Sequence, residues 1–498
     1  MRIALVNEGT YPVTTGGVST WCHRLVETLF EHEFHVVTLV GLERENLWPS
    51  LGNIGSVTMV PLWDPPAFGR TTGGQRREVS DALRLLWRAV LPADREEANV
   101  DLLRVALKQI VDSGHARLST VFDRVTSTRA ILEAWAGHAR AHPELPALPA
   151  GVAAEVARHA DRVLAVMDAE IPEVDLITAT ANGPASVLSL VRFWRRGTPV
   201  VLAEHGIYLR ERYLALGAAG WPWLTRYVMM AFLRGISQLV YADASALAPV
   251  SEFNARWEVK LGADPGNIVP IPNAIDHAEF PLVTWEPPVP TVSFVGRIDP
   301  LKDLDNLIVA FSYVRQVVPD AVLRLFGPTP QGNEQYRERL EARTRALGLD
   351  GVVTFEGPCK GPQPAILAGH VVALSSISEG MPFSVIEAMM SGRATVSTDV
   401  GGVAECVGRD GKYGIVVPAR DPKAFADALI WLLTEHQARR EMGRAARERA
   451  LDKYSIDVFR HRYQTLYDCL GPRRSAPGEP TRREPSFPRR AALMEKML

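Results

Sequence analysis

The chain has 498 residues, 47% of them hydrophobic, and its 55 Lys and Arg balance 57 Asp and Glu to a formal net charge of −2. This length and apolar content predict a folded protein with two or three cores, and the balanced charge offers no global field for nucleic acid or an anionic membrane. The four cysteines show no CxxC spacing, which argues against a disulfide framework or a zinc site and favours a reduced, cytoplasmic protein.

The start of the chain predicts a βαβ unit. Met1 runs directly into the strand-like residues 2–6 without the pattern of a signal peptide, so nothing here directs secretion. A loop containing Gly16 and Gly17 then leads into an amphipathic helix, from about 18 to 30, and residues 35–40 form the next expected strand.

A change of composition interrupts this first half. From about 75 to 170 the sequence is rich in Ala, Leu, Arg and Glu at helical spacing, which predicts a helical insertion. Strands return at 176–179 and 199–203. We therefore expect residues 1–284 to form a doubly wound, Rossmann-like domain that carries the insertion.

The longest apolar stretch, residues 213–232, is broken by Pro222 and Arg226, so it does not predict a membrane span. A buried core helix is the favoured interpretation. Its tryptophans, Trp221 and Trp223, leave contact with a membrane interface as the alternative.

A Pro-rich stretch at 285–290 is the expected interdomain linker. The alternation of strands and helices that follows predicts a second Rossmann-like domain over 291–454, closed by a helix at 455–470. The tail, 471–498, has seven basic and three acidic residues with little to bury, so we expect it to be disordered. The strands of this half are expected near 291–296, 321–326, 352–355, 371–375 and 394–398.

Two segments of the first half are candidate binding sites. Gly16 and Gly17 lie between a strand and a helix, where backbone amides can meet a diphosphate, although a plain tight turn explains them equally well. Their spacing is not the GxGxxG of dinucleotide binders, which weakens a nicotinamide interpretation. His205 follows a strand, where an imidazole can hydrogen-bond a ligand hydroxyl.

A third segment, 294–303, places Arg297 and Lys302 five positions apart between a strand and a helix. Two fixed cations there can converge on one diphosphate by charge-assisted hydrogen bonds. Asp303-Leu304-Asp305 fits a short metal-binding pattern, but it falls at a helix start, where Asp303 is expected as an N-cap. We therefore expect no metal site.

The strongest motif runs from Ser378 to Met389. Glu379 is expected in a loop above the sheet edge, where a carboxylate can bind sugar hydroxyls, and Glu387 in the following helix can accept hydrogen bonds from a ribose diol. The amides near Pro382 remain free for phosphate. Glu387 lies among apolar neighbours, so its carboxylate is expected to have a partner.

These four segments together resemble the retaining GT-B glycosyltransferases of family four, relatives of glycogen and sucrose-phosphate synthases, whose Glu-seven-residues-Glu motif corresponds to Glu379 and Glu387. The first half is also similar to PelF-type enzymes of exopolysaccharide synthesis, through residues 8–12, 16–19 and 204–208. The family has Gly where this chain has Ala274, so a turn of different shape or under strain is expected there.

The resemblance implies a fold of two Rossmann-like domains facing a cleft, in which the first binds the acceptor and the second the donor. It implies retaining transfer of a hexose from a nucleotide diphosphate-sugar, with UDP-glucose the first donor to test, to a glycan or another hydroxyl acceptor. Attack on the front face of the sugar would need no carboxylate nucleophile, metal or other cofactor. The implied catalytic residues are His205, Arg297, Lys302 and Glu379, and the implied donor-binding residues are Gly16, Gly17, Arg297, Lys302, Gly380, Met381, Pro382, Phe383, Ser384 and Glu387.

Three alternatives stay open: a nucleotide-sugar epimerase, a non-catalytic scaffold of a polysaccharide assembly complex, and a nicotinamide-dependent oxidoreductase. The insertion favours an acceptor-facing enzyme over an epimerase, and the retained charged residues argue against a scaffold. Tyr11, Arg210 and Arg212 are acceptor contacts suggested by position alone. Such a protein is also expected to be able to contact the inner face of the membrane, or partners in a polysaccharide assembly complex.

Overall fold

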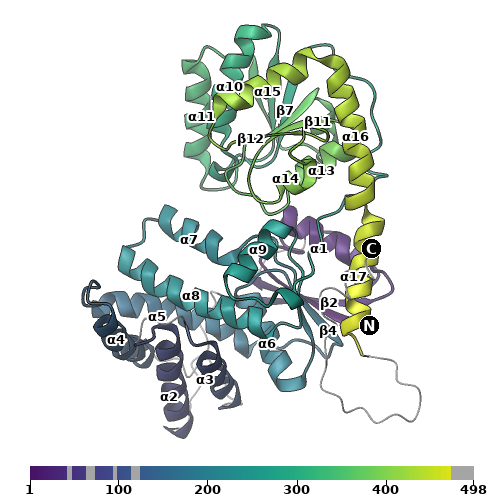
Figure 1. Ribbon diagram of the computed structural model, residues 1–498. Coiled ribbons are helices and arrows are strands. Elements are labelled where there is room, and N and C mark those ends of the chain that lie inside the picture. Colours follow the sequence, from purple (N-terminus) through teal and green to yellow (C-terminus); the bar gives the residue numbers. More distant parts are fainter. Residues whose placement is uncertain (42–46, 63–72, 94–97, 114–123, 473–498) are drawn as a thin grey trace. The chain divides into compact units, whose positions relative to one another are not determined.

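The computed structural model describes residues 1–41, 47–62, 73–93, 98–113 and 124–472. The chain divides into two compact units. Unit 1 comprises Met1–Pro249, Ala255–Pro270 and the chain from Tyr463 onward, and unit 2 comprises Val250–Asn254 and Ile271–Arg462. Each unit contains one six-stranded sheet (Figure 1). The expected pair of Rossmann-like α/β domains is therefore confirmed.

The sheet of unit 1 is parallel and has the order β3-β2-β1-β4-β5-β6. The chain moves outward from β1 to β3, returns to the centre at β4 and moves outward again to β6. Parallel strands covered on both faces are uniformly apolar, and all four residues of β4 are buried. The strands are β1 (Arg2–Glu8), β2 (Glu33–Val40), β3 (Ile54–Pro61), β4 (Leu176–Ala179), β5 (Val200–Leu202) and β6 (Ala246–Leu247).

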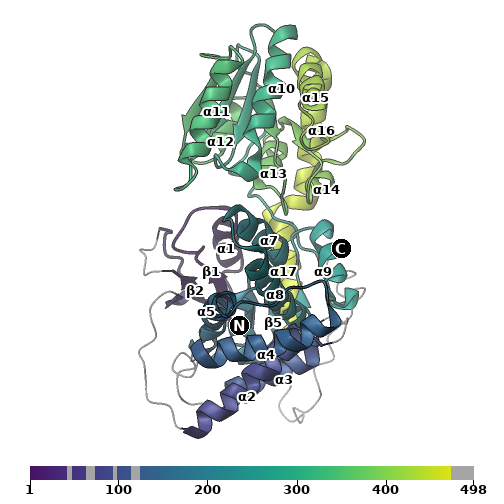
Figure 2. The ribbon, with the colours of Figure 1, turned by 90° about the vertical axis from the view of Figure 1, so that its left-hand side faces the viewer.

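In the described residues between β3 and β4, where the sequence predicts a helical insertion, the α-helices are α2 (Gly73–Val90), α3 (Val100–Asp112), α4 (Arg124–Ala141) and α5 (Ala150–Ala165). They gather beside α8 (Trp223–Asp243), as both views show (Figures 1 and 2). Trp87 of α2 stacks on Phe232 of α8 with ring centroids 5.5 Å apart. The insertion thus shares one core with the Rossmann-like part of unit 1.

The other described α-helices of unit 1 are α1 (Gly17–Thr28), α6 (Pro184–Arg196) and α7 (Tyr208–Ala218), together with most of α9 (Glu252–Lys260) and the end of α17 (Ile456–Leu470). Tyr467 of α17 is fully buried, and its hydroxyl lies 2.7 Å from Oγ1 of Thr178 in β4. This anchoring places the last residues of the closing helix in unit 1. Among the residues that the structure describes, no helix is long and apolar enough to cross a membrane.

The sheet of unit 2 is also parallel, with the order β12-β11-β10-β7-β8-β9. The five strands that the sequence predicts are confirmed, and β12 is an additional edge strand. The strands are β7 (Thr291–Val295), β8 (Val322–Phe326), β9 (Val353–Gly357), β10 (Val371–Leu374), β11 (Ala394–Thr398) and β12 (Ile415–Val417). The helices are α10 (Leu304–Val317), α11 (Glu334–Ala346), α12 (Gln363–Leu367), α13 (Phe383–Met390), α14 (Val403–Val407), α15 (Pro422–Thr434) and α16 (His436–Tyr454).

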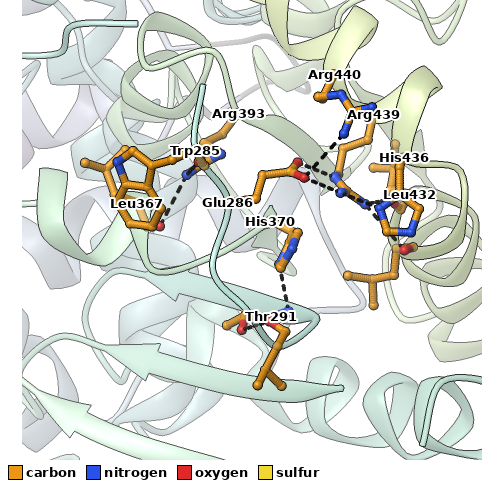
Figure 3. A network of polar contacts seen from close by, with 12 residues as sticks. Trp285, Glu286, Thr291, Leu367, His370, Arg393, Leu432, His436, Arg439 and Arg440 are labelled. Carbon is orange, nitrogen blue, oxygen red and sulfur yellow. Dashed lines mark hydrogen bonds and ion pairs between the residues drawn. The ribbon is translucent and has the colours of Figure 1, made fainter. Parts of the chain in front are cut away.

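The predicted linker, 285–290, belongs to unit 2, because the unit begins at Ile271. Glu286 binds the guanidinium of Arg439 in α16 through two hydrogen bonds of 2.8 and 2.7 Å (Figure 3). The side chain of Arg439 is only 2% exposed. The boundary between the units therefore lies about fifteen to twenty residues earlier than the Pro-rich composition suggests.

The same polar network runs along the amino edge of the sheet of unit 2 (Figure 3). Arg393, just before β11, donates to the backbone oxygen of Trp285 at 2.9 Å. His370, just before β10, accepts from the backbone N–H of Thr291 at 3.1 Å. Burial, followed by the charge of Arg439, lowers the pKa of His370 to about 4. This imidazole is thus neutral near pH 7 and acts as an acceptor.

Candidate functional site

The carboxyl edge of the sheet of unit 2 has a topological switch point between β7 and β10, where the chain leaves the sheet in opposite directions. Open α/β sheets bind ligands at such a point because the diverging loops leave a crevice. Lys302 lies in the loop after β7, and Glu379 in the loop after β10. The switch point thus brings together two residues that are 77 positions apart.

Lys302 and Glu379 form an ion pair, with Nζ 2.6 Å from Oε1. Their side chains are 20% and 12% exposed, so the pair is screened from water but open on one side. Ser376 donates to the same carboxylate oxygen at 2.6 Å. Ser375 donates to the backbone oxygen of Lys302 at 2.7 Å, which fixes the lysine loop to the end of β10. The two serines were not among the predicted site residues, although their place directly after a buried strand was visible in the sequence.

The backbone around Glu379 is held by a second loop, after β11. Gly401 has a positive φ of 58°, and a Cβ there would lie 1.7 Å from the backbone oxygen of Glu379. Gly402 donates to the backbone oxygen of Gly380 at 2.8 Å. Only glycine allows so close an approach, so the position of Glu379 depends on this Gly-Gly turn.

Arg297 lies in the loop after β7, as predicted, but its side chain is 57% exposed. Its Nη2 is 3.8 Å from Oδ2 of Asp299, a distance typical of a loose surface pair. The described contacts do not join it to Lys302. An exposed guanidinium is free to turn toward an anionic ligand, whereas Lys302 is already fixed.

Glu387 is 8% exposed, in agreement with the expectation of a carboxylate buried among apolar neighbours in α13. Burial, and to a lesser extent the negative charge of Glu387, raises the pKa of the Cys359 thiol. The loop after β9 therefore lies close to Glu387. The loop after β9 and α13 are thus neighbours at the carboxyl edge of the sheet.

The predicted donor contacts at the start of α13 divide into two groups. Met381 and Pro382 are buried, and the Sδ of Met381 lies 2.9 Å from the Sγ of Cys406, so its side chain belongs to the core. Phe383 and Ser384 are half-buried in the first turn. Pro382 is the N-cap and makes no side-chain cap hydrogen bond. The first backbone N–H groups of the helix lack intrahelical acceptors, as at any helix start, and can meet an anion.

Two expectations about local geometry can be compared with the structure. Asp303 is the N-cap of α10, as expected, with a φ of 45° and without a side-chain cap hydrogen bond. Asp305 instead pairs with Arg343 at 3.0 Å. Ala274 does not have a positive φ, so its turn carries no such strain. Its neighbour Asn273 donates to the backbone oxygen of Met381 at 2.7 Å and so supports the segment that precedes α13.

In unit 1, Gly16 is the N-cap of α1 and Gly17 its first residue, and both are exposed at the carboxyl edge of the sheet. His205 follows β5, and its ring meets Trp21 of α1 edge-on at 4.6 Å between centroids. Its Nε2 is buried without a hydrogen-bond partner among the described residues. Burial lowers the pKa of His205 to about 3, so the imidazole is neutral and retains its hydrogen-bonding capacity.

Two carboxylates that the predicted site did not include, Glu204 and Glu8, follow strands of the same sheet or end them, and Glu204 directly precedes His205. Glu204 accepts from the backbone N–H of Tyr208 at 3.1 Å and from the hydroxyl of Tyr241 at 2.9 Å. At the end of β1, Glu8 accepts from the backbone N–H of Ala185, at the start of α6, at 3.1 Å. Burial raises the pKa of Glu8 to about 7, and it also raises the pKa of Glu204, which shares a hydrogen bond with the buried carboxyl of Glu258. The pKa of Glu8 lies near neutrality, in the range of groups that exchange protons at binding sites.

The three acceptor contacts suggested by position differ in the structure. Tyr11 is fully buried, with its hydroxyl 3.3 Å from Nδ1 of His23, so it belongs to the core. Arg212 is exposed, and its guanidinium carbon lies 5.2 Å from the centre of the Tyr208 ring. Arg210, in the same turn of α7, is half-buried. Among the described residues, no group of three or more His, Cys, Asp or Glu side chains is arranged to hold a metal ion.

Comparison with known proteins adds two family matches. Residues 1–266 match the family described as Domain of unknown function (DUF3492), and residues 283–449 match Glycosyl transferases group 1. A D-inositol 3-phosphate glycosyltransferase of Kribbella flavida is 32% identical over 238 residues, which are 44% of this chain and 55% of that protein. The chain thus spans about half the length of the curated relatives that it matches.

Two solved structures share the fold over nearly the whole chain. Sucrose-phosphate synthase from Thermosynechococcus elongatus has a TM-score of 0.63 at 16% identity and covers 94% of this chain and 98% of its own. Anabaena HepE, solved with UDP and glucose, has a TM-score of 0.59 at 16% identity and covers 94% and 99%. These likenesses confirm the GT-B fold, whereas the similarity to PelF-type enzymes stays a prediction.

Proposed function

The chain belongs to the DUF3492 family and carries a group 1 glycosyl transferase domain, and from this membership we propose that it transfers a hexose from a nucleotide diphosphate-sugar to a hydroxyl acceptor. The acceptor is proposed to be a glycan or another hydroxyl compound of polysaccharide or glycoconjugate synthesis. UDP-glucose is the first donor to test, because HepE is described with UDP and glucose. The protein is proposed to act in the cytoplasm, or at the inner face of the membrane.

The observation that carries the proposal is the ion pair of Lys302 and Glu379 at the switch point of unit 2. Departure of a nucleoside diphosphate from a sugar places negative charge on a phosphate oxygen. A preorganised ammonium stabilises that charge at no cost of reorientation. In the proposed complex Lys302 meets the diphosphate, the exposed Arg297 turns toward it, and the amides of Phe383 and Ser384 bind its oxygens at the start of α13.

Glu387 and Glu379 are proposed to bind the two sugars of the donor. A largely buried carboxylate can accept hydrogen bonds from the two hydroxyls of a ribose, and this is the role proposed for Glu387. Glu379 already accepts from Lys302 and Ser376 on one oxygen, which leaves the other for a hydroxyl of the transferred sugar. A carboxylate held by a cation in this way is a weak nucleophile.

Retention is therefore proposed to proceed without a covalent enzyme intermediate. The acceptor hydroxyl attacks the face of the sugar from which the nucleotide leaves, and a phosphate oxygen takes its proton. No metal or other cofactor is required in this proposal, because Lys302 and Arg297 supply the positive charge. In unit 1 the neutral His205 is proposed to hydrogen-bond the reacting sugar or its acceptor, and the amides at Gly16 and Gly17 to bind the donor diphosphate.

The first experiment is calorimetric titration of the full chain with UDP, GDP and ADP, in EDTA and then with magnesium. We expect UDP binding that EDTA leaves intact. Binding that requires magnesium would contradict the charge roles of Lys302 and Arg297, and the absence of any nucleotide binding would favour the non-catalytic scaffold. Release of free sugar, or a changed sugar on the nucleotide, without any acceptor would favour the epimerase.

The second experiment measures turnover of the donor. Lys302→Ala should lower kcat by about 10²–10³-fold, as removal of one preorganised donor does elsewhere, while the affinity for UDP falls less. Lys423→Ala is the matched control, because Lys423 lies on α15 with a side chain that is 66% exposed. Equal turnover in the two variants would exclude the proposed role of Lys302.

A further inference from the structure

The apolar stretch at 213–232 is divided by the structure into two parts with different surroundings. From Val228 onward it is the middle of α8 and is mostly buried in the core of unit 1. The first part is the end of α7, the turn at 219–222 and the start of α8. There, Tyr213 is 60% exposed, Leu214 40% and Trp223 49%. The core-helix interpretation therefore holds only for the second part.

We call residues 213–225 the α7–α8 tip. No residue in it is charged, and Ala215, Gly217, Ala218, Ala219, Gly220 and Pro222 are exposed besides the three large side chains. Leu216, Trp221 and Leu224 are half-buried against the core and anchor the tip. Tyr208 is the only buried residue in α7, which packs mainly against α8 among the described elements (Figure 1). A helix end that is apolar on all sides is normally covered by another surface.

The charges that flank the tip indicate what covers it. The exposed Arg212 and the half-buried Arg210 precede it, and the half-buried Arg226 follows it. The acids at the tip are Glu211 and Glu155, whose carboxylate accepts from the hydroxyl of Thr225 at 3.5 Å. A cluster of Trp, Tyr and Leu without charges, bordered by arginines, is the composition of a segment that inserts its apolar side chains at the level of lipid headgroups. The arginines would then meet anionic headgroups.

We propose that the α7–α8 tip is a docking surface for an anionic phospholipid bilayer. Tyr213, Leu214 and Trp223 enter the interface, and the neighbouring arginines bind lipid phosphates. α7 begins three residues after His205, and its 11 residues put the tip about 15 Å along the helix from the carboxyl edge of unit 1. The hydroxyl end of a lipid-linked acceptor could span that distance while its lipid stays in the bilayer. The location given for the acceptor rests on the proposed transfer reaction. The membrane contact itself does not depend on that reaction.

Flotation of the full chain with phosphatidylcholine vesicles, with and without phosphatidylglycerol, tests the surface. The wild type should float with the vesicles that contain phosphatidylglycerol, and less at high salt. The triple variant Tyr213→Ser, Leu214→Ser, Trp223→Ser should lose about tenfold or more in vesicle partitioning, because it removes most of the buried apolar area. Since all three side chains are exposed, the variant should fold, and an unchanged thermal unfolding temperature checks this.

The matched control is the double variant Val317→Ser, Trp431→Ser. These side chains are 58% and 44% exposed on α10 and α15 of unit 2, so the change in exposed apolar area is similar in kind. The control should float as the wild type does. Titration with UDP distinguishes the two proposals. A chain that does not bind UDP but floats with vesicles would contradict the proposed reaction and leave the membrane contact intact.

Three results would overturn the proposal. The first is a wild type that does not float with anionic vesicles at low salt, or a triple variant that floats equally well. The second is a dimer in light scattering that the triple variant converts to a monomer, since a second copy would then cover the tip. The third is loss of flotation only when the tail arginines are changed to Gln, which would make the tail the anchor. These arginines are Arg473, Arg474, Arg482, Arg483, Arg489 and Arg490.

Discussion

Replacing Glu286 by Gln should destabilise unit 2 by an amount that the surroundings of Arg439 determine. The guanidinium is 2% exposed, makes two hydrogen bonds to Glu286 and donates to the backbone oxygen of Leu432 at 2.7 Å. Burial is the largest single influence and would raise the pKa of Glu286, but the hydrogen bonds and charge of Arg439, together with the charges of His370 and Arg440, hold the pKa below its usual value. The carboxylate is therefore the principal counter-charge of a buried cation.

The magnitude follows from what Gln retains. Removing one partner of a buried ion pair costs about 3–5 kcal/mol, because the other charge stays buried. Glu286 is 18% exposed, and Gln keeps one acceptor oxygen, so the lower end of about 3 kcal/mol is expected. For a unit of this size about 2–4 °C is lost per kcal/mol, which predicts a melting temperature about 6–12 °C lower.

Scanning calorimetry of the full chain measures this loss. UDP, if it binds as proposed, raises the transition of unit 2 and so identifies it. Asp305→Asn is the control, because Asp305 pairs with Arg343 and both side chains are nearly half exposed. That variant should change stability by less than about 1 kcal/mol. If Glu286→Gln lowered the transition no more than Asp305→Asn does, the role given to the buried pair would be refuted.

Three further predictions concern the glycine turn and the buried titratable groups. Gly401→Ala should lower the free energy of unfolding by more than about 2 kcal/mol and lower turnover, because its Cβ would collide with the backbone of Glu379. Gly411→Ala is the control: its φ is 74° but the space around it is open, so it should lower the free energy of unfolding by about 1 kcal/mol. Equal unfolding temperatures of the two variants would contradict this. The folded pKa of His370 is about 4, below the ordinary 6.5, so the unfolded chain binds more protons than the folded chain between these pH values. Stability should therefore fall as pH drops from 6.5 to 4. In His370→Asn the melting temperature should depend less on pH over this range. Glu204 has the opposite sign, because burial next to the carboxyl of Glu258 raises its folded pKa above the ordinary 4.5, so the unfolded chain loses this proton first and stability falls as pH rises above 4.5. Glu204→Gln should therefore be more stable relative to the wild type at pH 8 than at pH 5, and a variant with the wild-type pH profile would exclude this.

Local patterns in the sequence were sufficient to predict both sheets and the loops and helix starts that carry the candidate residues. Apolar runs such as 371–374, bounded by polar turns, are fully buried strands in the structure. The motif that ends in Glu387 predicted a buried carboxylate in a helix, and the structure has it. These features depend on neighbours within a few residues, which periodicity can detect.

The partners of the site residues could not be predicted, because they depend on strand order. Lys302 was expected to act with Arg297, but the adjacency of β7 and β10 gives it Glu379 instead. Met381 lies inside a motif that resembles a donor site, yet its contact with Cys406 makes it a core residue. The linker was placed by its prolines, while the residue that holds it, Arg439, lies 153 positions away from Glu286.

The anchoring of residues 271–290 to unit 2 limits how the two halves of such proteins can be recombined. A hybrid protein that receives unit 2 from a relative needs the transplanted piece to begin at Ile271, so that Asn273 and Glu286 arrive with Met381 and Arg439. A junction at residue 291 would combine Arg439 from one protein with a linker from another, so the ion pair with Glu286 would not be preserved as a unit. The Pro-rich segment, which looks like a natural cutting point, should thus be transferred together with unit 2.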